Sequence, residues 1–133
     1  MTDAILLWCQ PGRPFNRGEV TTGPKFQIEV GTFGEHRLIT VKGEIDMASA
    51  PGLQEAITED PSTVVLVDLS GVGFMDSTGL RSLLISRDHL ADGGGTLRLV
   101  YEDGPVQRII DLTGLADRFE IFESTSAAAL GAD

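Results

Sequence analysis

The sequence predicts an α/β domain in which a mixed β-sheet of roughly four to five strands is covered by about four α-helices. Three patterns support this fold class. Apolar and polar residues alternate at 26–30 and again at 37–41, as in the two strands of an antiparallel hairpin. A nearly continuous apolar run at 63–69 is typical of a strand buried on both faces. Helical and strand patterns then alternate, which predicts right-handed crossovers between parallel strands.

Turn residues and helix caps set the boundaries of the expected elements. Ser49 is expected to cap the first helix, Pro51 suits its first turn, and the glycine run at 93–95 ends the second helix. In order, the expected elements are strands at 26–30 and 37–41, a helix from Ser49 to about 59–61, a strand at 63–69, a helix from about Ser77 to Ala91, a strand at 96–101, a helix from Pro105 to Gly114, a short strand at 119–122 and a last helix from Ser124 to Leu130.

The first 24 residues lack a sustained period and contain scattered proline and glycine, which predicts an irregular extension ahead of a domain at 25–133. The single cysteine, Cys9, allows no intrachain disulfide and fits a reducing cytoplasm. The apolar run at 4–9 follows no basic segment and is too short for a signal peptide or a membrane span. We therefore expect a cytoplasmic protein without a membrane partner.

The charge balance argues against a nucleic-acid partner. Twenty acidic and ten basic residues give a net charge of −10, which repels a phosphate backbone. The same charge favours solubility and is compatible with a basic protein partner.

One hydroxyl, that of Ser77, falls between the buried strand and the second helix. Function in α/β proteins concentrates in loops at the carboxyl ends of such strands. Either Asp76 or Ser77 can cap the helix, and the backbone N–H groups of its first turn, together with the helix dipole, tolerate a phosphate. The position therefore suits a side chain that gains and loses charge.

The segment Met-Asp-Ser-Thr-Gly-Leu at 75–80, with Gly-Glu-Ile-Asp at 43–46, resembles the anti-sigma factor antagonist branch of the STAS family over roughly 25–130. The resemblance implies a STAS-like fold and a regulatory protein without enzymatic activity. It also implies that Ser77 is phosphorylated by a partner that is both anti-sigma factor and serine kinase, and that a serine phosphatase resets it. Thr78 is a less favoured target.

The unphosphorylated form would capture the anti-sigma factor and free its sigma factor, and phosphorylation would end that capture. The kinase would supply ATP and Mg²⁺, so no cofactor is expected in this chain. The partner-binding residues implied by the resemblance are Asp46, Asp76, Ser77, Thr78 and Gly79.

Each of these residues also has an ordinary structural interpretation. Asp46 could cap the first helix, for which the nearby serine competes, and Asp76 could cap the second helix while also contacting a partner. Gly79 either lets a partner approach the backbone or merely occupies the first helical turn. Thr78 is expected to contribute hydrogen bonds, and Ser77 itself could be a simple capping serine.

A phosphate on Ser77 adds about −1.5 to −2 charge beside Asp76. A partner carboxylate about 5 Å away, at an effective dielectric near 40, would be repelled by about 2 to 3 kcal/mol. The helix N-terminus offsets part of this charge within the protein. We therefore expect the fold to survive phosphorylation while partner affinity is lost.

Several enzyme classes are poorly supported. His89 lies twelve residues after Ser77, about 18 Å along a helix and too far to act as its base, and His36 belongs to no ligand cluster. The Gly-x-Ser-x-Gly elbow is missing because Met75 stands two residues before the serine. No nucleotide-binding or zinc-binding motif is found, so no metal site is expected.

Two alternatives remain at this stage. A response-regulator receiver could take phosphate on Asp68 at a strand end, but receivers need an acidic pair after the first strand and a lysine after a late one. The only lysines in the sequence are Lys25 and Lys42, so no lysine follows a late strand as a receiver requires. The other alternative is a STAS scaffold or ligand-binding subunit of a larger assembly.

Overall fold

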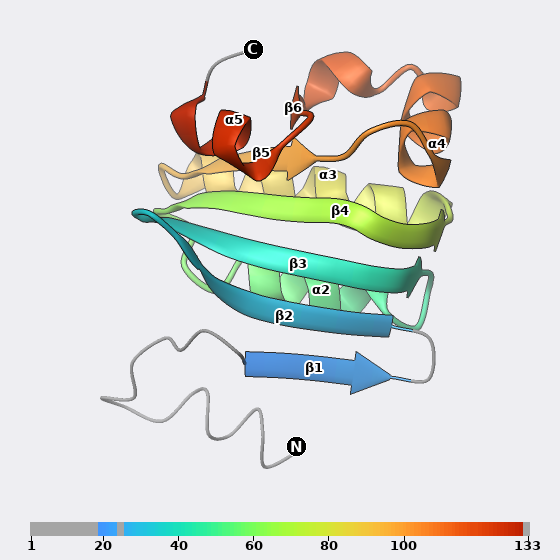
Figure 1. The fold of residues 1–133 in the computed structure, drawn as a ribbon, viewed down its shortest axis with the longest axis horizontal. Coiled ribbons are helices and arrows are strands. Elements are labelled where there is room, and N and C mark those ends of the chain that lie inside the picture. The colour runs from blue at the N-terminus through green and yellow to red at the C-terminus, as the bar shows by residue number, and fades with distance from the viewer. Residues whose placement is uncertain (1–18, 24–25, 132–133) are drawn as a thin grey trace.

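The computed structural model describes residues 19–23 and 26–131, and within them six strands form one mixed sheet in the order β1-β2-β3-β4-β5-β6 (Figure 1). The first three strands pair antiparallel, and β3 to β6 pair parallel. The strands are β1 (Glu19–Gly23), β2 (Phe26–Phe33), β3 (His36–Ile45), β4 (Val64–Met75), β5 (Thr96–Val100) and β6 (Glu120–Phe122). The predicted mixed α/β sheet is confirmed.

Four α-helices and one short 3₁₀-helix are present in the described residues. Helices α2 and α3 lie behind the sheet in Figure 1, and α5 lies in front of it. The 3₁₀-helix connects α4 to β6. The helices are α2 (Ala50–Ile57), α3 (Ser77–Asp92), α4 (Pro105–Thr113) and α5 (Thr125–Leu130), with the 3₁₀-helix at Ala116–Arg118.

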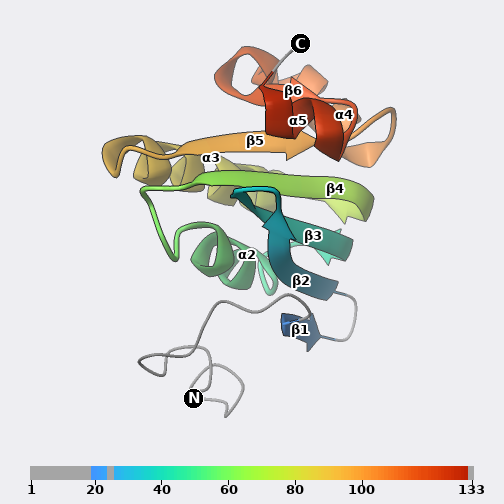
Figure 2. The ribbon, with the colours of Figure 1, turned by 60° about the vertical axis from the view of Figure 1, so that its left-hand side comes forward.

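The alternation of side chains along the central strand divides the interior into two unequal cores. Val65, Val67 and Leu69 of β4 point into the larger core, which α2, α3 and α4 cover. Leu66 points the other way, into a small cluster with Phe122. Helix α5 covers this face of the sheet (Figure 2). The helices on the first face therefore supply most of the apolar burial that stabilises the domain.

The helix boundaries follow the chemistry expected from the sequence. Asp76 and Ser124 accept hydrogen bonds from backbone N–H groups in the first turns of α3 and α5. Pro51 and Pro105 stand in the first turns of α2 and α4. Gly114 ends α4 with φ of 71°, a left-handed conformation that glycine adopts without steric cost.

Arg37, at the start of β3, ties the sheet to the end of α2. Its side chain is 9% exposed and donates hydrogen bonds to the carbonyl oxygens of Ala56 and Ile57. Its guanidinium also lies 3.5 Å from Glu59. Burial lowers the pKa of Arg37, and the charge of Glu59 acts in the opposite direction. The last carbonyl groups of α2 are thus satisfied by a cation, which also suits the helix dipole.

Two details of the sheet differ from the sequence predictions. The central strand continues to Met75 instead of ending at 69, with irregular pairing to β3 between Thr40 and Lys42 and between Gly43 and Glu44. The glycines and serine after residue 69 break the apolar pattern, so periodicity alone could not follow the strand.

The second difference is an extra strand. Residues 19–23, expected to be irregular, form β1 and raise the sheet from the predicted four to five strands to six. The rest of the predicted extension, with Cys9, lies outside the described residues, and the division of the chain at residue 24 stays a prediction. In the described part of the chain, no helix combines the length and apolarity needed to cross a bilayer.

Candidate functional site

The carboxyl ends of β3 and β4 lie side by side and bring together the two loops singled out by the sequence. Ile45 is in register with Met75, and the Asp76 N–H donates a hydrogen bond to the Ile45 carbonyl oxygen at 3.2 Å. The loop from Asp46 to α2 therefore adjoins the start of α3. The two motifs, about thirty residues apart in sequence, form one edge of the molecule.

Asp46 organises the loop that leads into α2. Its carboxylate Oδ1 accepts hydrogen bonds from the N–H groups of Ala48 at 2.9 Å and Ser49 at 3.2 Å. The Ser49 hydroxyl accepts from the Asp46 N–H at 2.9 Å and donates to the Glu44 carbonyl oxygen at 2.8 Å. Ser49 holds the N-cap position, but its side chain makes no capping bond to α2. It closes the loop instead, and Asp46 caps the turn before the helix.

Asp76 is the cap of α3, which resolves the choice between Asp76 and Ser77. Its Oδ1 accepts a hydrogen bond from the Gly79 N–H at 2.9 Å, and its carbonyl oxygen accepts from the Leu80 N–H at 3.1 Å. The carboxylate also carries the charge that the helix dipole favours at this end. Because Asp76 satisfies the first turn, the serine that follows is not needed as a cap.

Ser77 is the first residue of α3, and its side chain is exposed to solvent. Within the described residues its hydroxyl makes no hydrogen bond, and the N–H groups of Ser77 and Thr78 have no acceptor. Thr78 is exposed as well. The site therefore presents an accessible alcohol beside free backbone donors at the positive end of a helix dipole, where a phosphate is tolerated.

Gly79 is buried for a reason that the sequence did not suggest. A β-carbon at this position would stand 2.7 Å from Cγ2 of Ile45, 2.9 Å from Cγ of Met75 and 3.0 Å from the Ile45 carbonyl oxygen. The absence of a side chain lets the first turn of α3 pack directly on the end of β3. Gly79 thus fixes the position of Ser77 relative to the Asp46 loop.

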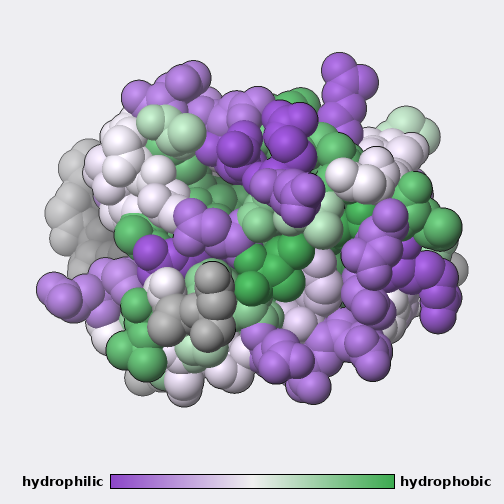
Figure 3. Space-filling model, turned by 90° about the horizontal axis from the view of Figure 1, so that it is seen from above, coloured by the Kyte–Doolittle hydropathy of each residue, from purple (hydrophilic) through white to green (hydrophobic). Residues whose placement is uncertain are grey.

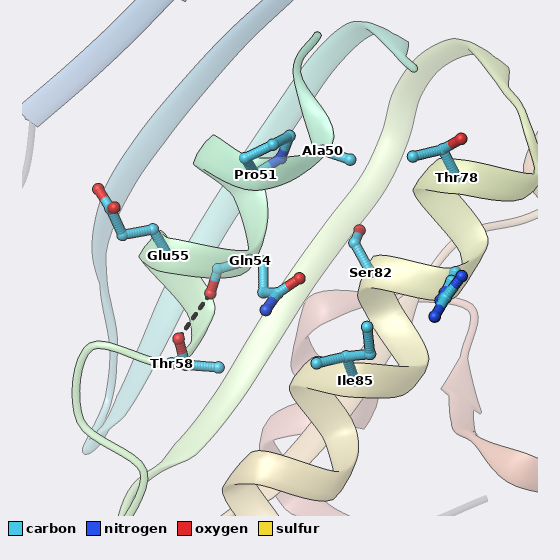
Figure 4. A pocket seen from close by; sticks show the side chains of 9 residues that line it. Ala50, Pro51, Gln54, Glu55, Thr58, Thr78, Ser82 and Ile85 are labelled. Carbon is cyan, nitrogen blue, oxygen red and sulfur yellow. Dashed lines mark hydrogen bonds between the residues drawn. The ribbon is translucent and has the colours of Figure 1, made fainter. Parts of the chain in front are cut away.

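A groove of about 530 Å³ runs between α2 and α3 from this edge (Figure 4). In Figure 4, Thr78, Ser82 and Ile85 point into it from α3, opposite Pro51 and Gln54 of α2. The full lining is Ala50, Pro51, Gln54, Glu55, Thr58, Thr78, Arg81, Ser82 and Ile85. The groove begins one residue from Ser77, so a partner that contacts the serine can also enter it.

Two exposed apolar side chains at this edge were missed by the sequence analysis. Met47, beside Asp46, is 75% exposed, and Phe74, in register with Glu44, is 47% exposed. A signal was present, since both are large apolar residues directly next to the two motifs, but neither falls in a periodic pattern. Exposed apolar area bordered by polar side chains is compatible with a protein-binding surface.

Other exposed apolar side chains lie on other elements, Leu112 on α4 and Leu130 on α5. Figure 3 looks from above, toward the end of the molecule that carries α4, β6 and α5, and shows an apolar area surrounded by polar side chains. The neighbourhood of Ser77 is therefore not the one place where apolar side chains reach solvent.

The remaining sequence candidates lie outside the Ser77 edge. Asp68 is inside β4, paired with Thr40 and Val100, and its carboxylate accepts the Ser70 N–H at 2.9 Å, so it is not at the strand end as predicted. His36 Nε2 lies 3.0 Å from the Ala129 carbonyl oxygen, and His89 is in the last turn of α3. In the part of the chain that the structure describes, no three His, Cys, Asp or Glu side chains gather as metal ligands.

Comparison with known proteins places this arrangement in a family context. The STAS domain family model matches residues 27–128. The anti-sigma-B factor antagonist of Staphylococcus aureus is 30% identical over 101 residues, covering 74% of this chain and 94% of that protein. The anti-sigma-F factor antagonist RsfB of Mycobacterium tuberculosis is 32% identical over 97 residues, covering 71% of this chain and 79% of that protein.

A solved structure is similar over the same region. The crystal structure of an anti-sigma factor antagonist from Mycobacterium paratuberculosis superposes with a TM-score of 0.72 and 30% sequence identity, covering 84% of this chain and 98% of that one. The family match at residues 27–128 includes the edge that carries Ser77.

Proposed function

Since this chain belongs to the STAS domain family, we propose that it is an anti-sigma factor antagonist whose binding activity is switched off by phosphorylation of Ser77. The accessibility of the Ser77 hydroxyl is the main support for this proposal. Its hydroxyl is exposed and has no hydrogen-bond partner among the described residues, because Asp76 supplies the cap of α3. The relatives that match most of this chain are named anti-sigma factor antagonists.

The partner in this proposal is an anti-sigma factor that is also a serine kinase. It transfers the γ-phosphoryl group of ATP to Ser77, so the bond from phosphorus to Oγ forms, the bond to the β-phosphate oxygen breaks, and ADP and the hydroxyl proton leave. The kinase supplies ATP and Mg²⁺. A serine phosphatase hydrolyses the phosphoester to reset the switch. This chain is then a binding protein of the cytoplasm and not an enzyme.

Capture of the partner relies on the edge that surrounds Ser77. Met47 and Phe74 offer apolar area, while Asp46 and Asp76 offer carboxylates to a basic surface. Both carboxylates already accept backbone hydrogen bonds, so they are held in fixed positions before a partner arrives. A preorganised surface loses less entropy on binding.

Phosphorylation ends capture through charge at this same edge. The phosphate adds about −1.5 to −2 charge to a site that already contains Asp76 and Asp46. The free N–H groups of Ser77 and Thr78 and the dipole of α3 offset that charge within the protein. The basic groups of the partner contact Asp46 and Asp76, whereas a partner carboxylate placed opposite Ser77 receives no such compensation and is repelled by the phosphate.

The test is affinity capture from lysate of the source cell, with the wild-type chain, Ser77→Ala and Ser77→Asp as bait, each with and without added ATP. Intact mass and phosphopeptide mapping follow. We expect wild type to lose its anti-sigma factor when ATP is added, Ser77→Ala to retain it, and Ser77→Asp to bind it weakly or not at all. Phosphate should appear on Ser77 of the wild type.

Two results would contradict the proposal. The first is phosphate on another residue with Ser77 unmodified. The second is Ser77→Asp binding the anti-sigma factor as tightly as the wild type, since a charge at this position would then not govern binding.

A further inference from the structure

Arg81 stands one helical turn after Ser77 on α3, and we propose that it is the internal counterion of the phosphorylated serine. When Ser77 carries phosphate, the Arg81 guanidinium pairs with it and is withdrawn from the groove between α2 and α3. This inference rests on the proposed function, because it concerns what phosphorylation of Ser77 does next.

Ser77 and Arg81 are four residues apart on α3. Residues i and i+4 of a helix are neighbours on its surface, with β-carbons about 5 to 6 Å apart. Helical side chains lean toward the N-terminus and cover the preceding turn. This general lean places the turn that carries Ser77 within reach of the Arg81 side chain. Consistent with this direction, Arg81 and Thr78 line the same groove.

The Arg81 guanidinium is available to pair with a phosphate. It is exposed and, within the described residues, makes no ion pair or side-chain hydrogen bond. Three other arginines are committed: Arg37 to the end of α2, Arg87 to Asp88 at 2.8 Å, and Arg98 to Glu120 at 3.3 Å. A guanidinium is well suited to phosphate because its N–H groups can contact two phosphate oxygens at once.

The groove between α2 and α3 contains few charged side chains. Among its nine lining residues Arg81 is the one cation and Glu55 the one acid. When Arg81 pairs with the phosphate on Ser77, the groove loses its positive charge and keeps the negative charge of Glu55. Phosphorylation then changes two surfaces together: the edge gains negative charge, and the groove loses its cation. A partner segment that places a carboxylate near Arg81 would lose that contact as well as meeting the phosphate.

The experiment inserts phosphoserine at position 77 during translation, so no kinase is needed. Three phosphoproteins are compared by ³¹P NMR titration: the otherwise wild-type chain, Arg81→Gln and the control Arg87→Gln. The control makes the same change of charge on the same helix, ten residues from Ser77. An adjacent guanidinium favours the doubly charged phosphate, so Arg81→Gln should raise the second pKa of the phosphate by about 0.1 to 0.4 pH unit. The carboxylates of Asp76, Asp46 and Glu55 are common to all three proteins.

A second readout follows the groove itself. In the wild-type background, phosphoserine at 77 should shift the NMR signals of the Gln54 side-chain amide and the Ile85 methyl groups, which line the groove beside Arg81. Arg81→Gln should reduce those shifts, and Arg87→Gln should leave them unchanged. The inference is overturned if Arg81→Gln and Arg87→Gln give the same phosphate pKa and the same groove signals. Failure of a kinase to label Ser77 would instead count against the proposed function.

Discussion

Gly79 lies so close to Ile45 that a β-carbon on the glycine would stand 2.7 Å from Cγ2 of Ile45 and 3.0 Å from its carbonyl oxygen. We therefore expect Gly79→Ala to force α3 away from the end of β3. The clash outweighs the gain in helix propensity, and the free energy of unfolding should fall by about 1 to 2 kcal/mol. Denaturant unfolding of Gly79→Ala and the wild type measures this difference in free energy.

Gly73→Ala is the matched control. A β-carbon on Gly73 would meet no atom within 4 Å, so its free energy of unfolding should change by no more than about 0.5 kcal/mol. Equal stability of the two variants would show that the contact between α3 and β3 is not tight at Gly79.

Asp76 supplies a cap and a charge, and two substitutions separate them. Asp76→Asn keeps an oxygen that can accept the Gly79 N–H, so it should cost only a few tenths of a kcal/mol, whereas Asp76→Ala removes the cap and should cost about 1 kcal/mol. Thermal unfolding of both variants measures this difference. If Asp76→Ala were as stable as the wild type, the first turn of α3 would not depend on this hydrogen bond.

The sequence was sufficient to predict the order of elements from β2 to α5 because local chemistry marks most of the boundaries. Asp76 and Ser124 cap helices, Pro105 opens one, and Gly114 closes it. Each of these effects acts within one turn of the chain, so no knowledge of the tertiary structure is required. The position of Ser77 at the start of a helix could be predicted on the same basis.

Features that depend on contacts between distant segments could not be predicted. The continuation of β4 to Met75 depends on pairing with β3, because its own residues after 69 show no strand pattern. The burial of Gly79 depends on Ile45, which lies 34 residues earlier. The groove and the availability of Arg81 likewise appear only once α2 and α3 are packed together.

Among substitutions of polar residues in this domain, Arg37→Met should be one of the more destabilising. The substitution keeps much of the aliphatic volume but leaves the Ala56 and Ile57 carbonyl oxygens without their donor. Buried groups that lose a charged partner cost about 1.5 to 3 kcal/mol. Denaturant unfolding should show this loss, while Arg87→Met, which removes an exposed pair with Asp88, should change stability by no more than about 0.5 kcal/mol. Equal effects would contradict a structural role for Arg37.

Tyr101 should make the folded protein less stable at alkaline pH. Burial, with a smaller contribution from Asp111, raises the pKa of Tyr101 from 10.0 to about 12. Between these values the unfolded chain releases the phenolic proton and the folded chain keeps it, so this contribution to stability is fully present below pH 10 and is lost as pH rises toward 12. Tyr101 is the one tyrosine in the sequence, so tyrosinate absorbance follows this group directly.

Tyr101→Phe removes the titrating group, and its stability should not show this part of the alkaline decline. A tyrosinate transition near pH 10 in the folded wild type would contradict the burial of the hydroxyl.

Met47 and Phe74 should contribute apolar contacts to the anti-sigma factor in the proposed complex. Burying such a side chain at an interface contributes about 1.5 to 3 kcal/mol, so Met47→Ser and Phe74→Ser should each weaken binding about tenfold to a hundredfold. Both side chains are exposed in the free domain, and neither substitution should lower the melting temperature by more than about 2 to 4 °C. Titration calorimetry with the captured anti-sigma factor measures the affinity.

Leu112→Ser is the control for this pair, because Leu112 is 80% exposed on α4 and is not part of the edge around Ser77. It makes a comparable loss of apolar surface and should leave the affinity unchanged. If Leu112→Ser weakened binding and the Met47 and Phe74 variants did not, the partner would contact the α4 side of the molecule. The electrostatic switch at Ser77 would then need to act on a surface that the partner does not touch, and the mechanism proposed for phosphorylation would be wrong.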